Sequence, residues 1–211
     1  MRKWYPVTLI VVASVASALA YANLPDRVPT HWNVRGQVDG TGTRLQLSLL
    51  LPTLILVLWP LLRLLPTIDP RRANFAKFQD TYDLVVNLIL TILVVIHLAL
   101  LGVALGLPID IARVIPAGLG LMLVVIGNLL PRARSNWWFG IRTPWTLSSD
   151  RVWERTHRVG GYLLAAAGLV IVAASFLRPP ILGTVVAIAI GGAALASVVY
   201  SYIAWKEESS R

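Results

Sequence analysis

The 211-residue chain contains no cysteine and few charged residues. Without cysteine there is no disulfide framework, no thiolate zinc site and no thiol nucleophile. Only 14% of the residues are charged, whereas a soluble domain carries about 25%. Hydrophobic residues make up 56% of the chain. Water is therefore not the main solvent, and we expect an integral membrane protein.

Six apolar segments are long enough to cross a bilayer as helices. They cover residues 4–22, 46–66, 81–106, 112–130, 158–177 and 181–205. Ten-residue segments of alternating hydrophobicity, typical of a membrane barrel, do not occur. The predicted fold class is therefore an all-α polytopic protein with six transmembrane helices. The first segment also fits a cleavable signal, but we expect it to be retained because five ordinary spans follow it.

The net charge of +9 is explained by topology, not by nucleic-acid binding. With the N-terminus inside, the outer segments hold five basic residues, Arg27, Arg35, Arg44, Arg113 and Arg178. The inner segments hold the other fourteen: Arg2, Lys3, Arg63, Arg71, Arg72, Lys77, Arg132, Arg134, Arg142, Arg151, Arg155, Arg158, Lys206 and Arg211. The positive-inside rule then predicts that both termini are cytoplasmic. No direct contact with nucleic acid is expected.

The chain is expected to have two units. Residues 1–66 would form a two-helix unit with an extracytoplasmic loop over 23–45. Residues 67–211 would form a four-helix unit with a cytoplasmic loop over 131–157. The outer loop is rich in proline and glycine and contains Trp32, which favours an ordered loop lying against the membrane.

The three histidines do not predict a metal site. His31 lies in the outer loop, and helical rise places His97 in the outer half of the third segment, whereas His157 lies at the inner boundary. The three therefore cannot share one ion. A His31–His97 pair completed by Asp26, Asp39 or Asp110 lacks a spacing signature. We expect no metal and no cofactor.

Polar residues line one face of the third segment. Asp80, Asp83, Asn87 and Thr91 recur at spacings of three and four, and His97 lies further along. A transporter would place such residues beside a water-filled path. A row of interhelical hydrogen bonds is the preferred interpretation, because no acid lies at mid-membrane, where a charge costs about 2.5–3.5 kcal/mol on insertion scales.

Close helix packing is expected in the last two segments. Gly161, Ala165 and Gly168 in the fifth, and Ala187, Gly191 and Gly192 in the sixth, permit close approach of the backbones.

The stretch "NWWFGIRTPWTLSSDRVWERTHR", residues 136–158, is basic and aromatic between two apolar segments. Pro144 keeps Thr143 out of helical geometry, and Ser148 or Ser149 is suited to cap the next helix. Anionic lipid, a protein partner, or a catalytic pocket of Asn136, Arg142 and His157 would each explain these residues. Chemistry is least supported, because the sequence has no adjacent nucleophile–base pair and no paired-carboxylate spacing. We therefore expect no enzyme.

Two stretches resemble a known family. "GNLLPRARSNWWFGIRTPWTLSSDRVWERTHRVGG", residues 127–161, resembles the signature of the SdpI family of bacterial membrane proteins. "LPDRVPTHWNVRGQVDG", residues 24–40, resembles the small domain of unknown function that commonly precedes it. Together the two stretches occur in the family's order, and six spans fit the family as well.

The resemblance implies immunity to a secreted antimicrobial peptide at the bacterial cytoplasmic membrane. It also implies that a cognate winged-helix repressor is held at the membrane. The implied outer residues are Pro25, Pro29, His31, Asn33 and Gly36, to which we add Trp32. The implied inner residues, which would bind a partner or lipid, are Asn128, Asn136, Gly140, Arg142, Thr143, Pro144, Trp145, Thr146, Trp153, Thr156 and His157. The alternatives are a transporter or lipid-handling protein using Asp83, Asn87, Thr91 and His97, or a membrane enzyme with an outer histidine metal site.

Overall fold

The computed structural model describes residues 4–33 and 35–210, which form eight α-helices and one two-stranded sheet. The order is α1 (Tyr5–Tyr21), β1 (Arg27–Trp32), β2 (Val38–Thr43), α2 (Arg44–Ile68), α3 (Arg72–Phe75), α4 (Gln79–Ala104), α5 (Ile111–Leu129), the 3-10 turn η1 (Leu130–Arg132), α6 (Pro144–Ser148), α7 (Asp150–Ala174) and α8 (Pro179–Ser209). Five helices are long and apolar enough to cross a membrane, and α1 is a shorter apolar helix. The predicted all-α polytopic fold is confirmed.

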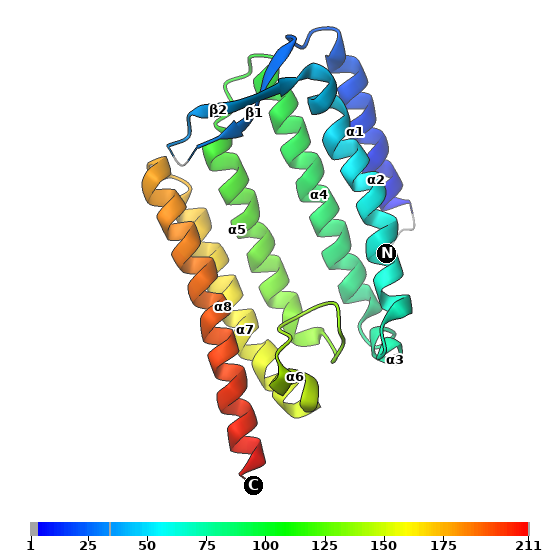
Figure 1. Ribbon diagram of the computed structural model, residues 1–211, viewed down its shortest axis with the longest axis vertical. Helices are drawn as coiled ribbons and strands as arrows, with labels where there is room; N and C mark the ends of the chain where they lie inside the picture. The colour runs from blue at the N-terminus through cyan, green and yellow to red at the C-terminus, as the bar shows by residue number, and fades with distance from the viewer. Residues whose placement is uncertain (1–3, 34, 211) are drawn as a thin grey trace.

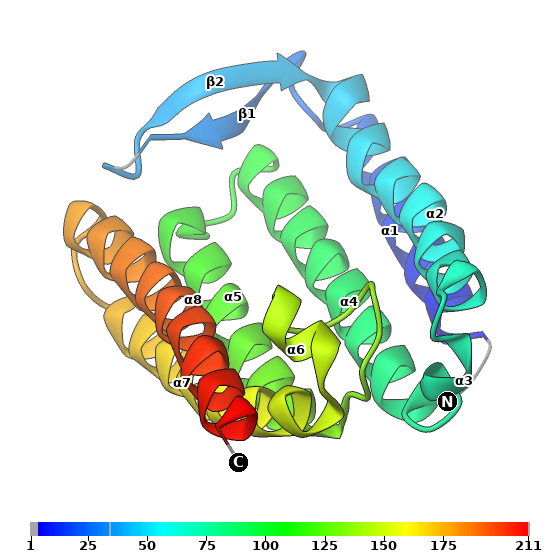
Figure 2. The same ribbon diagram turned by 60° about the horizontal axis from the view of Figure 1, so that its bottom comes forward.

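The helices form two groups that lie side by side (Figures 1 and 2). Helices α1, α2 and α4 pack against one another, as do α5, α7 and α8, and the α4–α5 contact joins the groups. The division of the chain at residue 66 stays a prediction, since α4 contacts α1 and α2 as well as α5. Arg2, Lys3 and Arg211, used in the orientation argument, lie outside the described residues.

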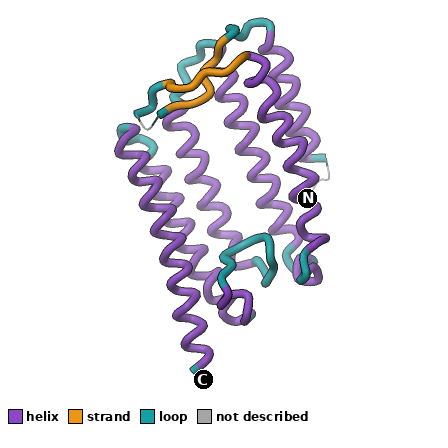
Figure 3. Tube along the Cα trace, viewed as in Figure 1, coloured by secondary structure: helices purple, strands orange, loops and turns teal. Residues whose placement is uncertain are grey.

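The two ends of the bundle differ in structure (Figure 3). The sheet crosses one end, which we call the hairpin end. The segment between α5 and α7, residues 130–149, lies at the opposite end with α3. We call this segment the motif loop and this end the motif end.

The stretch expected to be an ordered loop is an antiparallel hairpin. Its strands pair from Arg27 opposite Thr43 to Trp32 opposite Val38, with irregular register around His31. Sequence reasoning missed the strands because their prolines and glycines indicate turns. A two-stranded sheet tolerates them, since every strand in it is an edge. Thr43 ends β2 and forms a capping box with Gln46, so α2 begins directly where the hairpin ends.

Helices α5 and α7 meet through two pairs of glycines. A Cβ added at Gly127 would lie 2.6 Å from the carbonyl oxygen of Gly161, and one at Gly120 would lie 2.7 Å from that of Gly168. Small residues permit this approach in membranes, where packing drives association. The close packing predicted at Gly161 and Gly168 is confirmed. The same prediction for α8 is wrong for Gly191 and Gly192, since a Cβ added at either would have nothing within 4 Å beyond its chain neighbours and the backbone of its own helix.

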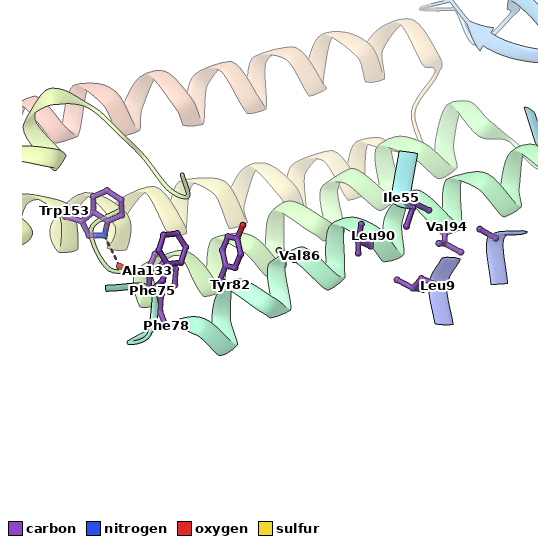
Figure 4. Close-up of a cluster of buried hydrophobic side chains, with 11 residues drawn as sticks. Leu9, Ile55, Phe75, Phe78, Tyr82, Val86, Leu90, Val94, Ala133 and Trp153 are labelled. Carbon is purple, nitrogen blue, oxygen red and sulfur yellow. Dashed lines mark hydrogen bonds between the residues drawn. The ribbon is translucent and has the colours of Figure 1, made fainter. Parts of the chain in front are cut away.

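A buried aromatic cluster joins the first helix group to the motif end (Figure 4). The rings of Phe75 and Phe78 stack with centroids 5.0 Å apart, and Tyr82 meets Phe75 edge to face at 5.2 Å. Trp153 of α7 belongs to the same cluster, and its Nε1–H donates to the carbonyl oxygen of Ala133 over 2.8 Å. The motif loop is thereby packed against both helix groups.

Candidate functional site

Asn136 organises the first half of the motif loop. Its side chain is fully buried, and its amide donates to the carbonyl oxygens of Arg134 (2.8 Å) and Phe139 (2.9 Å). Its oxygen accepts the backbone N–H groups of Trp138 (2.9 Å) and Phe139 (2.6 Å). Because both amide hydrogens and the oxygen are used inside the loop, Asn136 fixes the shape of the loop and does not contact solvent.

His157 connects α7 to the second half of the loop. Its Nε2 accepts the backbone N–H of Ile141 over 3.0 Å, and its Nδ1 lies 2.8 Å from the carbonyl oxygen of Trp153. A backbone N–H only donates and a carbonyl only accepts, so the proton lies on Nδ1 and the ring is neutral. The ring stacks on Trp153 with centroids 3.9 Å apart. Both ring nitrogens therefore already have partners.

Thr143 and Thr146 build the turn into α6. They form a capping box, in which Thr143 Oγ1 accepts the N–H of Thr146 and Thr146 Oγ1 accepts the N–H of Thr143. Thr146 also donates to the carbonyl oxygen of Ile141 over 2.9 Å. Thr143 Oγ1 lies 3.1 Å from Ser201 Oγ, which ties the loop to α8. The extended Thr143 and the Ser149 cap of α7 are confirmed.

The segment between α2 and α4 docks onto the motif loop. The buried Asp69 accepts the N–H of Trp137 over 2.8 Å. Arg71 donates to Ser135 Oγ and, over 2.6 Å, to the carbonyl oxygen of Leu147. Sequence reasoning missed Asp69 and Arg71. The available signal was an acid placed directly after an apolar helix.

The exposed part of the motif loop is aromatic and basic. Trp137 and Trp138 are 47% and 41% exposed, and the exposed Arg142 donates to the carbonyl oxygen of Trp137 over 2.5 Å. We call Trp137, Trp138 and Arg142 the motif surface. Asn128 and Pro144 are also exposed. Trp145 is half-buried and meets Tyr202 edge to face.

Two acids of α7 and α8, Glu154 and Glu207, pair with arginines that do not belong to the motif surface. Glu154 bonds Arg134 over 2.5 Å, and Glu207 bonds Arg155 over 2.6 Å. Arg142 has no ion pair with any acid in residues 4–33 and 35–210. Its charge is therefore available to a partner.

The inner residues expected from the sequence thus fall into a buried group and a more exposed group. Those that are buried are Asn136, Thr143, Thr146, Trp153, Thr156 and His157. Gly140, half-buried, has φ +116°. The structure brings the group together in one loop and its helix, but a partner can touch only the exposed members. Their assignment to partner or lipid binding stays a prediction.

The hairpin end carries the outer residues. Asn33 Oδ1 accepts the N–H groups of Arg35 and Gln37, and Gly36 has φ +75° in the turn. His31 Nδ1 lies 2.5 Å from Asp39 Oδ1 at the surface. A pocket of about 480 Å³ lies beneath the hairpin, and its lining includes His31, Trp32, Asn33 and Gly36. Pro25 is exposed and Pro29 half-buried.

Two polar residues of α4, Thr91 and His97, bond side chains of α1. Thr91 Oγ1 lies 2.8 Å from the hydroxyl of Tyr5, and the buried His97 Nε2 lies 2.8 Å from Ser17 Oγ. These are the interhelical bonds expected of a packing role. Asp83 bonds Gln79 within α4, and Thr91 also donates to the Asn87 carbonyl oxygen.

His31 and His97 have separate partners, and so does His157. No group of three or more His, Asp or Glu side chains suited to a metal ion occurs in the described part of the chain. His31 and His97, which the sequence offered as a possible pair, therefore do not belong to such a group of three.

Comparison with known proteins gives matches that cover segments at both ends of the bundle. Residues 132–201 match the SdpI/YfhL protein family, and residues 8–56 match a domain of unknown function, DUF1648. The chain is 25% identical over 201 residues to the protein named Immunity protein SdpI of Bacillus subtilis (strain 168), covering 95% of this chain and 94% of that one. No solved structure matches. The first match covers residues 132–149 of the motif loop, and the second includes the hairpin.

Proposed function

Because its resemblance to the SdpI family is confirmed, we propose that this membrane protein gives immunity to a secreted antimicrobial peptide that acts at the membrane. The observation that carries the proposal is the similarity to an immunity protein over 95% of the chain, which includes both ends of the bundle. The role is non-enzymatic. In support, the side chains of Thr146 and His157 bond backbone groups, so in this geometry neither belongs to a nucleophile–base pair.

The protein would lie in the bacterial cytoplasmic membrane with both termini inside. This orientation places the hairpin end outside and the basic motif end in the cytoplasm. The hairpin, with His31 and Trp32, would then meet the peptide or shield its membrane target. The rigid turn at Gly36 and the bonds of Asn33 would hold these side chains in place.

The motif surface would hold a winged-helix repressor at the membrane. Tryptophan and arginine are the residue types that contribute most to binding at protein interfaces. The buried Asn136, Thr146 and His157 would keep the loop in one shape, so that a partner need not order it on binding. Signalling additionally requires two arrangements of the bundle that the peptide distinguishes.

The first test is survival of the native host carrying a deletion of this gene. Cells would be challenged with concentrated culture medium from the parent strain. We expect the deletion strain to be killed and the wild-type gene to restore growth. Equal survival of the deletion strain and the parent would contradict the immunity proposal.

The second test addresses signalling. Arg142→Ala should abolish induction of the gene by the medium while the protein remains in the membrane, as measured by a transcriptional reporter and by immunoblotting. Arg158→Ala is the matched control, since Arg158 is an exposed arginine at the same end outside the motif surface. Induction that survives Arg142→Ala would remove Arg142 from the partner site.

A further inference from the structure

We propose that the pocket beneath the hairpin binds an acyl chain of an anionic phospholipid, whose headgroup is held by Arg35 and Arg178. The proposal concerns a different site from the motif surface and does not depend on the immunity role. It rests on the shape of the pocket, the chemistry of its walls and the charges at its edge.

The pocket has apolar walls from both helix groups and a roof formed by the hairpin. The walls come from α2, α4, α5 and α8, which contribute Leu47, Leu51, Leu100, Ile115 and Pro179 among others. The lining residue Leu50 is 68% exposed. The pocket therefore opens on the apolar outer face of α2, where lipid surrounds a membrane helix.

The pocket extends from the helix ends toward the bilayer interior. Leu51 lies seven residues after the start of α2, and Ile96 lies eight residues before the end of α4. At the α-helical rise these positions lie about 10–12 Å along their helices. A chain entering beside Leu50 would run parallel to the helices, with its headgroup level with the hairpin.

An acyl chain suits this space better than water or a peptide. Buried water needs two to four polar partners. The polar lining residues Thr30, His31, Asn33 and Gln46 lie in the hairpin and in the first turn of α2, whereas the remaining walls are apolar. The backbone groups of those walls are already bonded within their helices. A peptide chain would also need partners for its own N–H and C=O groups at that depth. A hydrocarbon chain needs none.

Two arginines at the edge of the pocket favour a negative headgroup. Gly36 of the hairpin turn packs on Pro179, since a Cβ added at Gly36 would lie 3.1 Å from Pro179 Cγ. Arg35 and Arg178 directly precede these two residues in the chain, and both are exposed.

Two other arginines of this end are already paired, whereas Arg27, in β1, has no ion pair in the described residues. Arg44 pairs with Asp26 at 3.6 Å and Arg113 with Asp110 at 2.9 Å. Neither Arg35 nor Arg178 has an ion pair within the described ranges. Guanidinium groups bind phosphate with two parallel hydrogen bonds. Each of these arginines therefore carries a charge that no acid neutralises, and each directly precedes a residue that lines the pocket.

The test is native mass spectrometry of the purified full-length protein in detergent, titrated with dioleoyl phosphatidylglycerol or dioleoyl phosphatidylcholine. We expect phosphatidylglycerol to bind about tenfold more tightly, given two basic residues near the headgroup. The Arg35→Glu and Arg178→Glu double variant should lose this preference and still bind phosphatidylcholine.

The second part of the test fills the pocket with a larger side chain. Gly183 lines the pocket, and a Cβ added there meets no atom within 4 Å, which is equally true of Gly191 outside the pocket. Gly183→Trp should weaken binding of both lipids at least about tenfold, whereas Gly191→Trp should bind like wild type. Gly183→Leu is the milder variant if the tryptophan lowers the thermal midpoint.

Several results would overturn the assignment. These are equal binding of the two lipids by wild type, an unchanged preference in the double glutamate variant, and wild-type affinity in both Gly183 variants. Protein released from its native membrane should carry phospholipid mass. A bound peptide or a second copy of the chain in place of lipid, lost in Gly183→Trp, would also overturn it.

Discussion

Gly140 and His157 occupy adjoining space at the centre of the motif loop. Gly140 has φ +116°, and a Cβ built on it would lie 2.2 Å from Nε2 of His157. That nitrogen accepts the N–H of Ile141, so the glycine allows the backbone to approach the ring closely enough for the bond to form. The glycine in "WFGIRTPW" is thus required by both conformation and space.

Gly140→Ala should therefore destabilise the loop. The strained backbone costs about 1–3 kcal/mol, and displacement of His157 adds about 1–3 kcal/mol of overpacking. We expect a lower thermal midpoint in detergent and faster trypsin cleavage after Arg142. Gly106→Ala is the control, because Gly106 has φ +86° but no atom within 4 Å of an added Cβ. Equal effects of the two variants would show that His157 does not require a glycine.

Asn136→Asp should open the same loop by changing one atom. The carboxylate would place an oxygen where the amide now donates to the carbonyl oxygens of Arg134 and Phe139. Losing both buried bonds costs about 1–3 kcal/mol or more. Asn128→Asp, at an exposed position, should cost less. Hydrogen exchange of residues 134–141 measures the effect, and unchanged protection in Asn136→Asp would refute it.

Gly161→Val should separate α5 from α7. A Cβ at Gly161 would already lie 2.6 Å from the carbonyl oxygen of Gly127, and valine adds two methyl groups. Overpacking of this kind costs about 1–3 kcal/mol. Gly191→Val, on the open face of α8, should leave the thermal midpoint near that of wild type. A stable Gly161→Val protein would mean that the two helices do not meet at this point.

Ser17→Ala should loosen the packing of α1 against α2 and α4. Ser17 Oγ donates to the carbonyl oxygen of Ser48 and lies 2.8 Å from His97 Nε2, so it bonds both neighbouring helices. Removing the hydroxyl leaves the buried Nε2 of His97 without this partner, at about 1–3 kcal/mol. Thr184→Ala is the control, since Thr184 is exposed and bonds only within α8. The difference between their thermal midpoints checks the prediction, which fails if the midpoints coincide.

The positions of the helices followed from the sequence with small errors. Apolar length alone predicted six segments, because lipid leaves the backbone few structures other than a helix. The largest difference is at α7, which begins at Asp150, although the apolar segment was placed at 158. Its first two turns are polar, so hydropathy excluded them, whereas the Ser149 cap indicated the true start.

Side-chain roles in the motif loop were harder to predict. Composition presented Asn136, Arg142 and His157 as equal candidates for a site. In the structure Asn136 and His157 are buried and fix the loop, whereas Arg142 is exposed beside Trp137 and Trp138. A sequence lists residue types but does not say which face solvent, because that depends on chain segments far apart, such as Asp69 bonding Trp137.

The sequence by itself determined a polytopic helical membrane protein, the extended Thr143, the cap of α7 and the family resemblance. All of these depend on local composition, spacing and motifs. Tertiary structure alone decided the hairpin register, the glycine contacts between α5 and α7, and the burial of His157 against Gly140. It also decided that four helices and the hairpin enclose a pocket. These features arise between segments far apart in the chain, where packing and hydrogen-bond geometry, not local propensity, select the arrangement.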